Sequence, residues 1–372
     1  MVGLKHAVLV APVAMVVGSV AMTSTAAAED GFRFYGSLNG AVTSVDDGVE
    51  RRNEFSDNSN APSRIGAWYE MGANAGTLKF NFETALGLRG TSSLSMDSSD
   101  DFFDWDKTDL RKFEAIYETE RFGTFYVGQG SMASDGISGG TDMSGTDLSG
   151  TVAIADTAGG FAFQPAGGGA AGPTIGDVFK DFDGSRKGRV RYDTPSFGGF
   201  VVSASAGTEI LKDNDDTNFY DVALRYGNDF GDTTFKATLA YAQTDGASDD
   251  SKSVLGSVGA LHNPTGISGT LTVGQSDRDS GLKSDYVYAK VGLQRDWFAM
   301  GRTHLSVDAY RGNDMFDVAG DKSVAYGFEA VQKIDNANVD LFFSYHQHGY
   351  DVNTGTTYND VDAYMLGARW SF

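Results

Sequence analysis

Hydrophobic and polar residues alternate one by one along much of the chain. In residues 78–88 one face collects the apolar side chains of Leu78, Phe80, Phe82, Leu86 and Leu88, and the other collects Lys79, Asn81 and Glu83. Successive side chains of a β-strand point to opposite faces, so this period of two predicts strands. Comparable segments recur from Phe32 to Phe372. We count about sixteen of them, an even number that a closed antiparallel sheet requires.

The polar face of these strands carries full charges, of which Lys79 and Glu83 are examples. The dry core of a β-sandwich could not accommodate such charges, whereas a water-filled lumen can. A closed barrel satisfies all of its backbone hydrogen bonds internally and can therefore lie in lipid. The pattern predicts an all-β fold, a transmembrane antiparallel β-barrel of about 16 strands.

The links between the predicted strands alternate in length. Short links lie at residues 72–76, 118–121, 227–232, 262–266 and 334–338. Longer links lie at about residues 45–62, 89–108, 130–187, 208–217, 244–250, 276–285, 312–323 and 348–359. Barrels of outer membranes have short turns at one end and long loops at the other, so this parity supports the barrel. The aromatic residues beside the short links predict an interfacial girdle, made of Phe122, Phe197, Phe230, Trp297 and Phe298.

Composition narrows the possible functions. The 372 residues include 48 Gly, 6 Pro and no Cys, and 12% are aromatic. Glycine weakens helices and aromatic residues favour strands, which agrees with the pattern. A formal net charge of −21 argues against nucleic-acid binding, since that function needs clustered cations. The lack of cysteine excludes thiol catalysis and cysteine-ligated zinc.

The first 28 residues predict a signal peptide. Lys5 precedes a mostly apolar stretch from Ala7 to Ala21, and Ala26 to Ala28 form a small-residue cleavage site. The apolar stretch is shorter than the ~20 residues that a spanning helix needs, which makes a retained membrane anchor the weaker alternative. We therefore expect an exported mature chain, residues 29–372. Loss of Lys5 changes its formal charge from −21 to −22.

Three segments carry a resemblance to a known family. The last predicted strand places Tyr364, Leu366, Ala368, Trp370 and terminal Phe372 on one face. This resembles the C-terminal assembly signal of Gram-negative outer-membrane barrels, in which Tyr364, Trp370 and Phe372 would be recognised. Residues 121–138 and 188–207 resemble the fifth strand and the sixth-to-seventh strand hairpin of general diffusion porins. In architecture the whole mature chain is similar to these trimeric, sixteen-stranded porins.

The resemblance implies a homotrimer in the outer membrane of a Gram-negative bacterium. Its partners would be outer-membrane lipid, lipopolysaccharide and the barrel assembly machinery, with no nucleic acid. It implies a water-filled channel for passive diffusion of small hydrophilic solutes and ions, with no enzymatic activity and no required cofactor. The charge of the mature chain favours cations. The alternative is a substrate-selective channel for a sugar or another nutrient, guided by Tyr286, Tyr288 and Tyr310.

In this family the loop after the fifth strand folds into the barrel and narrows the channel. Residues 130–187 hold that position and are richer in glycine than expected for the family. The predicted acidic side of the constriction consists of Asp135, Asp142, Asp147, Asp156, Asp177, Asp181 and Asp183. Strand alternation predicts a basic wall made of Arg33, Arg64, Lys79, Lys112, Arg189 and Arg191. Opposed charges across a narrow opening would create a transverse field that favours polar solutes.

Other motifs carry weaker signals. Residues 136–140 match G-x-S-x-G, but the Gly-rich and Ser-rich stretch that follows does not predict the helix that a nucleophile elbow needs. His346 and His348 share a strand face and could bind a metal together with Asp351. Two acidic clusters could hold structural Ca²⁺, namely Asp97, Asp100, Asp101, Asp104 and Asp106, and Asp213, Asp215 and Asp216.

Overall fold

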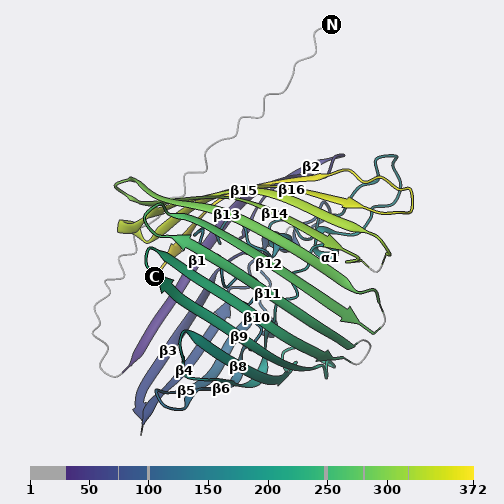
Figure 1. Ribbon diagram of the computed structural model, residues 1–372. Helices are drawn as coiled ribbons and strands as arrows, with labels where there is room; N and C mark the ends of the chain where they lie inside the picture. The colour runs from purple at the N-terminus through teal and green to yellow at the C-terminus, as the bar shows by residue number, and fades with distance from the viewer. Residues whose placement is uncertain (1–30, 74, 99–100, 247–249, 280, 317) are drawn as a thin grey trace.

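Seventeen β-strands make up one antiparallel sheet that closes on itself in the part of the chain that the computed structural model describes (Figure 1). The described residues are 31–73, 75–98, 101–246, 250–279, 281–316 and 318–372, so the predicted signal peptide lies outside them. The strands are β1 (Phe32–Asp46), β2 (Arg51–Asp57), β3 (Arg64–Ala73), β4 (Gly76–Ala85), β5 (Leu110–Thr119), β6 (Gly123–Ser131), β7 (Arg186–Asp193), β8 (Phe200–Thr208), β9 (Asn218–Phe230), β10 (Thr233–Asp245), β11 (Asp250–His262), β12 (Ile267–Arg278), β13 (Ser284–Phe298), β14 (Gly301–Asn313), β15 (Lys322–Ile334), β16 (Val339–Asp351) and β17 (Val361–Ser371).

The barrel has sixteen strand positions, because β2 and β3 share one. β2 pairs with the second half of β1, from Gly40 to Asp46, and β3 pairs with the first half, from Phe32 to Ser37. Residues 58–63 leave the sheet between them. The predicted all-β, sixteen-stranded barrel is therefore confirmed among the described residues.

Closure of the barrel joins the two ends of the sheet. β1 pairs with β17 from Ser37 opposite Ser371 to Asp46 opposite Asp362. The amide of Phe372 donates to the carbonyl oxygen of Gly36 at 3.0 Å, and the Gly36 amide donates back at 2.9 Å. The C-terminal residue thus completes the seam and leaves no free sheet edge there.

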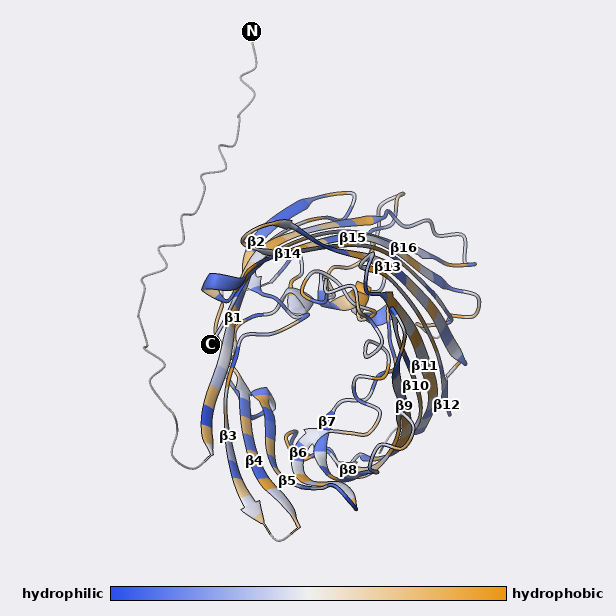
Figure 2. Cartoon of the chain, turned by 60° about the vertical axis from the view of Figure 1, so that its left-hand side comes forward, coloured by the Kyte–Doolittle hydropathy of each residue, from blue (hydrophilic) through white to orange (hydrophobic). Residues whose placement is uncertain are grey.

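The two faces of the strands differ as the alternation predicts. Along β12 every second residue is exposed, among them the apolar Leu271 and Val273, while the intervening Thr270 and Thr272 are buried. In β4, Phe80 and Phe82 are exposed, and Glu83 is buried. Figure 2 shows the same alternation of hydrophilic and hydrophobic residues along the strands. The apolar side chains therefore face outward and the polar ones inward.

Link lengths follow the predicted parity with three exceptions. The link expected at residues 276–285 spans only residues 279–283, between β12 and β13. β1 continues to Asp46 and β2 begins at Arg51, so the long link expected at residues 45–62 is a tight connection followed by an interrupted strand. β10 ends at Asp245 and β11 begins at Asp250, which makes that link short as well. In the latter two places the strands extend further than the turn-forming composition predicted, because their ends pair in register.

Helical structure is confined to single turns in the described residues. These are η1 (Thr91–Ser93), η2 (Lys107–Asp109), η3 (Ile154–Asp156), α1 (Ile175–Val178) and η4 (Asp335–Ala337). Within the same residues, no helix has the length and apolar character needed to cross a bilayer.

Candidate functional site

Residues 132–185, which we call the inner loop, connect β6 to β7 and run inside the ring of strands (Figure 2). The loop begins against β9. Asp221 accepts hydrogen bonds from the amide of Ser134 at 2.8 Å and from its hydroxyl at 2.5 Å. Arg225 donates to the carbonyl oxygen of Ala133 at 2.6 Å. Both wall residues come from positions of β9 that face inward, so the sheet register fixes where the loop starts.

The middle of the inner loop is held by β12 to β14. Thr272 donates its hydroxyl hydrogen to the carbonyl oxygen of Ser138 at 2.9 Å. Lys290 donates to the carbonyl oxygen of Gly150 at 2.8 Å and pairs with Asp142 at 3.2 Å. These contacts satisfy buried backbone carbonyls that the irregular loop could not satisfy by itself.

The last part of the inner loop packs on aromatic side chains of the wall. Tyr286 and Tyr310 donate their hydroxyl hydrogens to the carbonyl oxygens of Asp181 and Lys180, both at 2.7 Å. The ring of Phe179 lies 5.1 Å from that of Tyr310. Tyr288 is buried too and donates to Asp308. The interpretation of these three tyrosines as an exposed sugar track is wrong, because the loop covers them.

Most acidic residues of the inner loop have a structural partner. Asp142 faces Lys290, and Asp177 accepts a hydrogen bond from the Thr174 amide at 2.8 Å, which caps α1. Asp183 accepts from the amides of Gly136, Ile137 and Ser138 at 2.8 to 3.2 Å. These three carboxylates stabilise the loop.

The other four acidic residues differ in their surroundings. Asp181 accepts from the Asp183 amide at 3.2 Å, and Asp156 lies in η3. Asp147 is exposed. Asp135 lies within electrostatic range of Arg186 and Arg225. Asp135 thus lies near two inward-facing arginines outside the predicted basic wall, and its role at a constriction stays a prediction.

The pKa of Asp183 is raised to about 7, first by burial and then by the neighbouring charge of Asp181. Burial likewise raises the pKa of Asp156 to about 7. A carboxyl whose folded pKa lies above its unfolded value stabilises the fold most at low pH and loses that contribution as pH rises through the folded pKa. We expect the inner loop to be held more tightly at pH 5 than at pH 8.

Hydrogen exchange of the loop amides, corrected for the intrinsic pH dependence, measures this difference. Exchange should be slower at pH 5. The variant Asp156→Asn/Asp183→Asn keeps one acceptor oxygen at each position and should lose most of the pH dependence. Equal dependence in the variant and the parent protein would contradict the assignment.

A cavity of about 520 Å³ lies beside the end of the inner loop, lined in part by residues of β2 and of β4 to β7. Its charged lining comprises Asp57, Asp109, Arg111, Arg186, Lys187, Glu209 and Lys212. Arg111 pairs with Glu83 at 2.6 Å, and Lys187 with Glu209 at 2.7 Å. Arg186 lies at the point where the loop enters β7. The cavity is polar and mixed in charge, as an aqueous passage would be.

Four cations in or near this cavity form no ion pair. Among the described residues, Arg186 and Lys212 in the lining, and Arg64 and Lys112 nearby, make none within 4.0 Å. Arg64 lies within electrostatic range of Arg111 and Arg186. Like charges gathered on one wall produce a positive local potential. Arg64 and Lys112 lie on the inward-facing side of β3 and β5 but do not line the cavity, and their role at a constriction stays a prediction.

Arg111 and Arg186 were not predicted as wall residues. A register shift in the pairing of β4 with β5, between Glu83 and Thr84, adds a residue at Arg111. A bulge of this kind breaks the alternation. As a result Arg111 and Lys112, although adjacent in sequence, both face Glu83. Arg186 lies before the part of β7 in which polar and apolar residues clearly alternate. The sequence therefore did not predict whether its side chain faces inward or outward.

The remaining predicted basic residues lie away from the cavity or are enclosed. Arg33 and Lys79 lie at the short-turn end of the barrel, where they face Glu70 at 4.0 Å and Glu118 at 2.7 Å. Arg191 pairs with Asp193 at 2.8 Å. Arg189 is buried and forms an ion pair with Glu114. Arg189 points inward as expected, yet it does not reach the aqueous cavity.

The predicted metal sites are arranged differently from expectation. His346 lies beside Asp308 and Glu329, whereas the ring of His348 is 3.2 Å from the carbonyl oxygen of Val361 and Asp351 is exposed.

Lys107 forms an ion pair with Asp213, which joins the two acidic loop clusters. Ca²⁺ binding by these clusters stays a prediction. Residues 136–140 lie in turns, without the strand-to-helix context of a nucleophile elbow.

The closed barrel with an apolar exterior, a polar interior and an internal loop defines the class of outer-membrane channels. A model of the family described as Gram-negative porin matches residues 13–353. The chain belongs to this family. A search of curated proteins finds no significant match.

Solved structures with the same fold include the anion-selective porin from Comamonas acidovorans. It is 16% identical over 92% of this chain and 100% of its own, with a TM-score of 0.62. OprB from Pseudomonas putida is 10% identical over 92% of this chain and 94% of its own, with a TM-score of 0.63. OmpF from Salmonella typhi is 14% identical over 92% and 97%, with a TM-score of 0.57.

Proposed function

We propose that this porin is a water-filled channel through which small hydrophilic solutes and ions diffuse passively across the outer membrane. The observation that carries the proposal is the polar cavity of about 520 Å³ beside the end of the inner loop, lined in part by β2 and by β4 to β7. In this view residues 130–187 form the constriction. Solutes pass on the side of the loop that faces the basic wall, since the other side is filled by packed residues such as Tyr310 and Phe179.

We further propose that the wall cations, and not the total charge of the chain, determine ion preference. Net charge predicts a cation-preferring channel, but ions respond most strongly to the charges nearest their path. Arg64, Lys112, Arg186 and Lys212 are described cations without an ion pair in or near the cavity, and they outnumber Asp57 and Asp109, the lining acids without one; most acids of the inner loop are bonded to the loop itself. The balance favours a weak preference for anions.

The test is the reversal potential of the purified protein in a planar bilayer under a salt gradient. Two unit charges 4 Å apart interact by about 1 kcal/mol in water, so neutralising Arg64 and Arg186 to Gln should lower the anion-to-cation permeability ratio roughly fivefold. The control is Arg33→Gln at the short-turn end, which should leave the ratio unchanged. A cation-selective parent channel, or equal ratios in the variant and the parent, would contradict the proposed role of the wall.

A channel selective for a sugar is the second candidate, although the covered tyrosines remove its main support. Block of the conductance by one sugar and not by others would favour it.

Assembly is proposed from the family and the surface. The mature chain begins at Glu29 after cleavage of the signal peptide, and Tyr364, Trp370 and Phe372 form the signal read by the barrel assembly machinery. We propose a homotrimer in contact with outer-membrane lipid and lipopolysaccharide. An apolar groove on the outer face, lined by Phe32, Tyr69, Phe80, Phe82 and Phe113, offers contact area for lipid or a second copy.

A further inference from the structure

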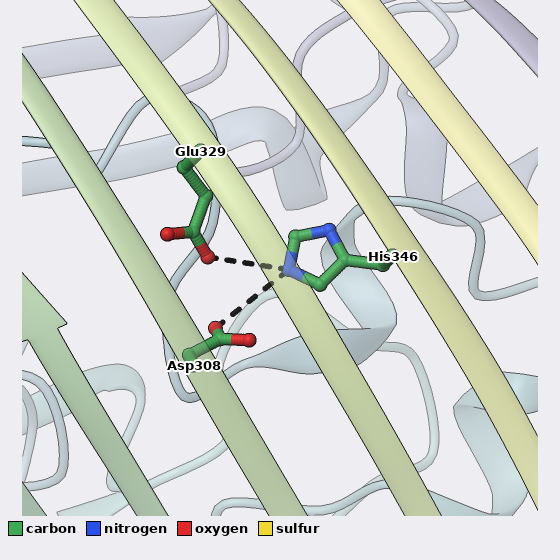
Figure 3. A group of neighbouring side chains, drawn as sticks. All are labelled: Asp308, Glu329 and His346. Carbon is green, nitrogen blue, oxygen red and sulfur yellow. Dashed lines mark ion pairs between the residues drawn. The ribbon is translucent and has the colours of Figure 1, made fainter.

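Three ionisable side chains from neighbouring strands meet beneath the inner loop (Figure 3). They are Asp308 of β14, Glu329 of β15 and His346 of β16. In the register, Gly327 of β15 lies opposite both Asp308 and His346, and Glu329 lies two residues further along β15. The side chains of the three residues are 0%, 0% and 1% exposed. The channel proposed above makes no use of this group.

The spacing of these side chains suits a metal ion. His346 Nε2 lies 3.4 Å from Glu329 Oε1 and 3.7 Å from Asp308 Oδ2, and the three candidate ligand atoms lie within 4.8 Å of one another. Nitrogen and oxygen ligands bind Zn²⁺ tetrahedrally at about 2.0–2.2 Å, which places neighbouring ligand atoms roughly 3.3–3.6 Å apart. The observed separations lie close to that range.

Several polar atoms that face this gap have no hydrogen-bond partner in the described protein. They are Asp308 Oδ1, Glu329 Oε1 and His346 Nε2, although a protonated His346 would lie within ion-pair distance of both carboxylates. The other oxygen of each carboxylate accepts a hydrogen bond, since Tyr288 donates to Asp308 Oδ2 at 2.9 Å and Ser306 donates to Glu329 Oε2. Asp308 Oδ2 also lies 3.7 Å from His346 Nε2, so either oxygen of Asp308 can serve as the ligand atom. Leaving buried polar atoms unpaired costs about 1–3 kcal/mol each, so the arrangement favours a bound cation.

Two glycines leave the gap open. A Cβ atom on Gly327 would lie 2.3 Å from Asp308 Oδ1 and 2.5 Å from His346 Nε2. A Cβ atom on Gly150 of the inner loop would lie 2.8 Å from Glu329 Oε1. Neither glycine has a positive φ, so the backbone conformation does not demand glycine at either position. Glycine is needed at both positions because a side chain there would fill the gap.

The charges of the residues around this gap also favour a bound metal ion. Asp308, Glu329 and the adjacent Asp142 contribute three negative charges, and Lys290 contributes one positive charge at 3.2 Å from Asp142 and 3.8 Å from Glu329. A proton on His346 would leave a net charge of −1, because −3 + 1 + 1 = −1. A divalent cation with neutral His346 gives −3 + 1 + 2 = 0. Buried charges are costly unless they are compensated.

We propose that Asp308, Glu329 and His346 bind one divalent transition-metal ion of the Zn²⁺ class. The imidazole nitrogen among the donors favours such an ion over Ca²⁺ or Mg²⁺, which prefer ligands made only of oxygen. The ion joins β14, β15 and β16 beneath Gly150, where Lys290 also binds the loop. It therefore acts as a structural clamp on the wall that supports the inner loop.

The site is tested on the full-length mature protein, unfolded in chelator and refolded with or without Zn²⁺. Refolded parent protein should retain about one Zn²⁺ per chain after desalting, measured by elemental analysis. Refolding with Co²⁺ should produce the visible absorption of a tetrahedral cobalt site. His346→Gln and Glu329→Gln should each lose the bound metal and the absorption.

His348→Gln is the matched control, because His348 is buried two residues away on the same strand and its ring centroid is 6.1 Å from that of His346. This variant should bind metal as the parent does. Gly327→Ala keeps all three ligands but fills the gap, so it should also lose the metal. Folding of every variant is checked by its heat-modifiable mobility on gels.

Parent protein that folds without retaining metal would overturn the proposal and would leave His346 as a protonated partner of the two carboxylates. Equal metal retention by the parent and by folded His346→Gln or Glu329→Gln would overturn it as well. These readouts do not depend on conductance, so failure of the metal site and failure of the proposed channel are distinguishable.

Discussion

Replacing Arg189 with Met is expected to lower the free energy of unfolding of the barrel by about 3–5 kcal/mol, since it leaves a buried charge on Glu114 without compensation. The two side chains form an ion pair and are only 2% and 5% exposed. Arg189 also donates to the carbonyl oxygens of Ser131 and Gly128, each at 3.1 Å. Urea unfolding of the protein in detergent micelles or lipid vesicles, followed by tryptophan fluorescence, measures the loss.

The double variant Arg189→Met/Glu114→Gln serves as the control, because it removes both charges. It should recover a large part of the lost stability. The reversal potential should change little in a folded Arg189→Met channel, since Arg189 does not reach the cavity. A single variant as stable as the parent protein would show that the pair contributes nothing.

Replacing Phe163 with Ala should release the inner loop without unfolding the barrel. Phe163 is completely buried in the loop core, with its ring 5.6 Å from that of Tyr350 of the wall. A buried Phe→Ala change costs about 3–5 kcal/mol. Since each 1.4 kcal/mol is a factor of ten, hydrogen exchange of residues 150–182 should accelerate by roughly 100-fold or more.

Single-channel conductance should rise in the Phe163→Ala variant, because a released loop obstructs the lumen less. Phe80→Ala is the control, since Phe80 is 43% exposed on the outer face and touches no part of this core. Its loop exchange and conductance should match those of the parent protein. Unchanged loop exchange in Phe163→Ala would contradict the role assigned to the loop core.

The barrel was predictable because one simple rule covers most of the chain. Alternation assigned Phe80 to the outer face and Glu83 to the inner face, and the structure agrees. The rule fails where the backbone departs from it. The register shift between β4 and β5 beside Glu83 turns Arg111 inward, and no residue in the local sequence predicts this bulge.

The inner loop was the harder part to predict, because its contacts join residues far apart in sequence. Lys290 meets Gly150, and Tyr286 meets Asp181. Tyr286 on the polar face of a strand predicted exposure to water, and only the packing of Phe182 on it makes it a core residue. The triad of Asp308, Glu329 and His346 likewise depends on the register of three strands.

The interruption between β2 and β3 has a consequence for the order of assembly. Asn58, in this interruption, donates to the carbonyl oxygen of Leu148 at 2.7 Å, near the tip of the inner loop. Leu148 packs with residues from both ends of the chain, among them Ala41 of β1 and Met365 of β17. The hydrophobic site that holds Leu148 is complete only after β1 and β17 have paired. We therefore expect the middle of the inner loop to dock late, after β1 has paired with β17, so that the passage acquires its final width only then.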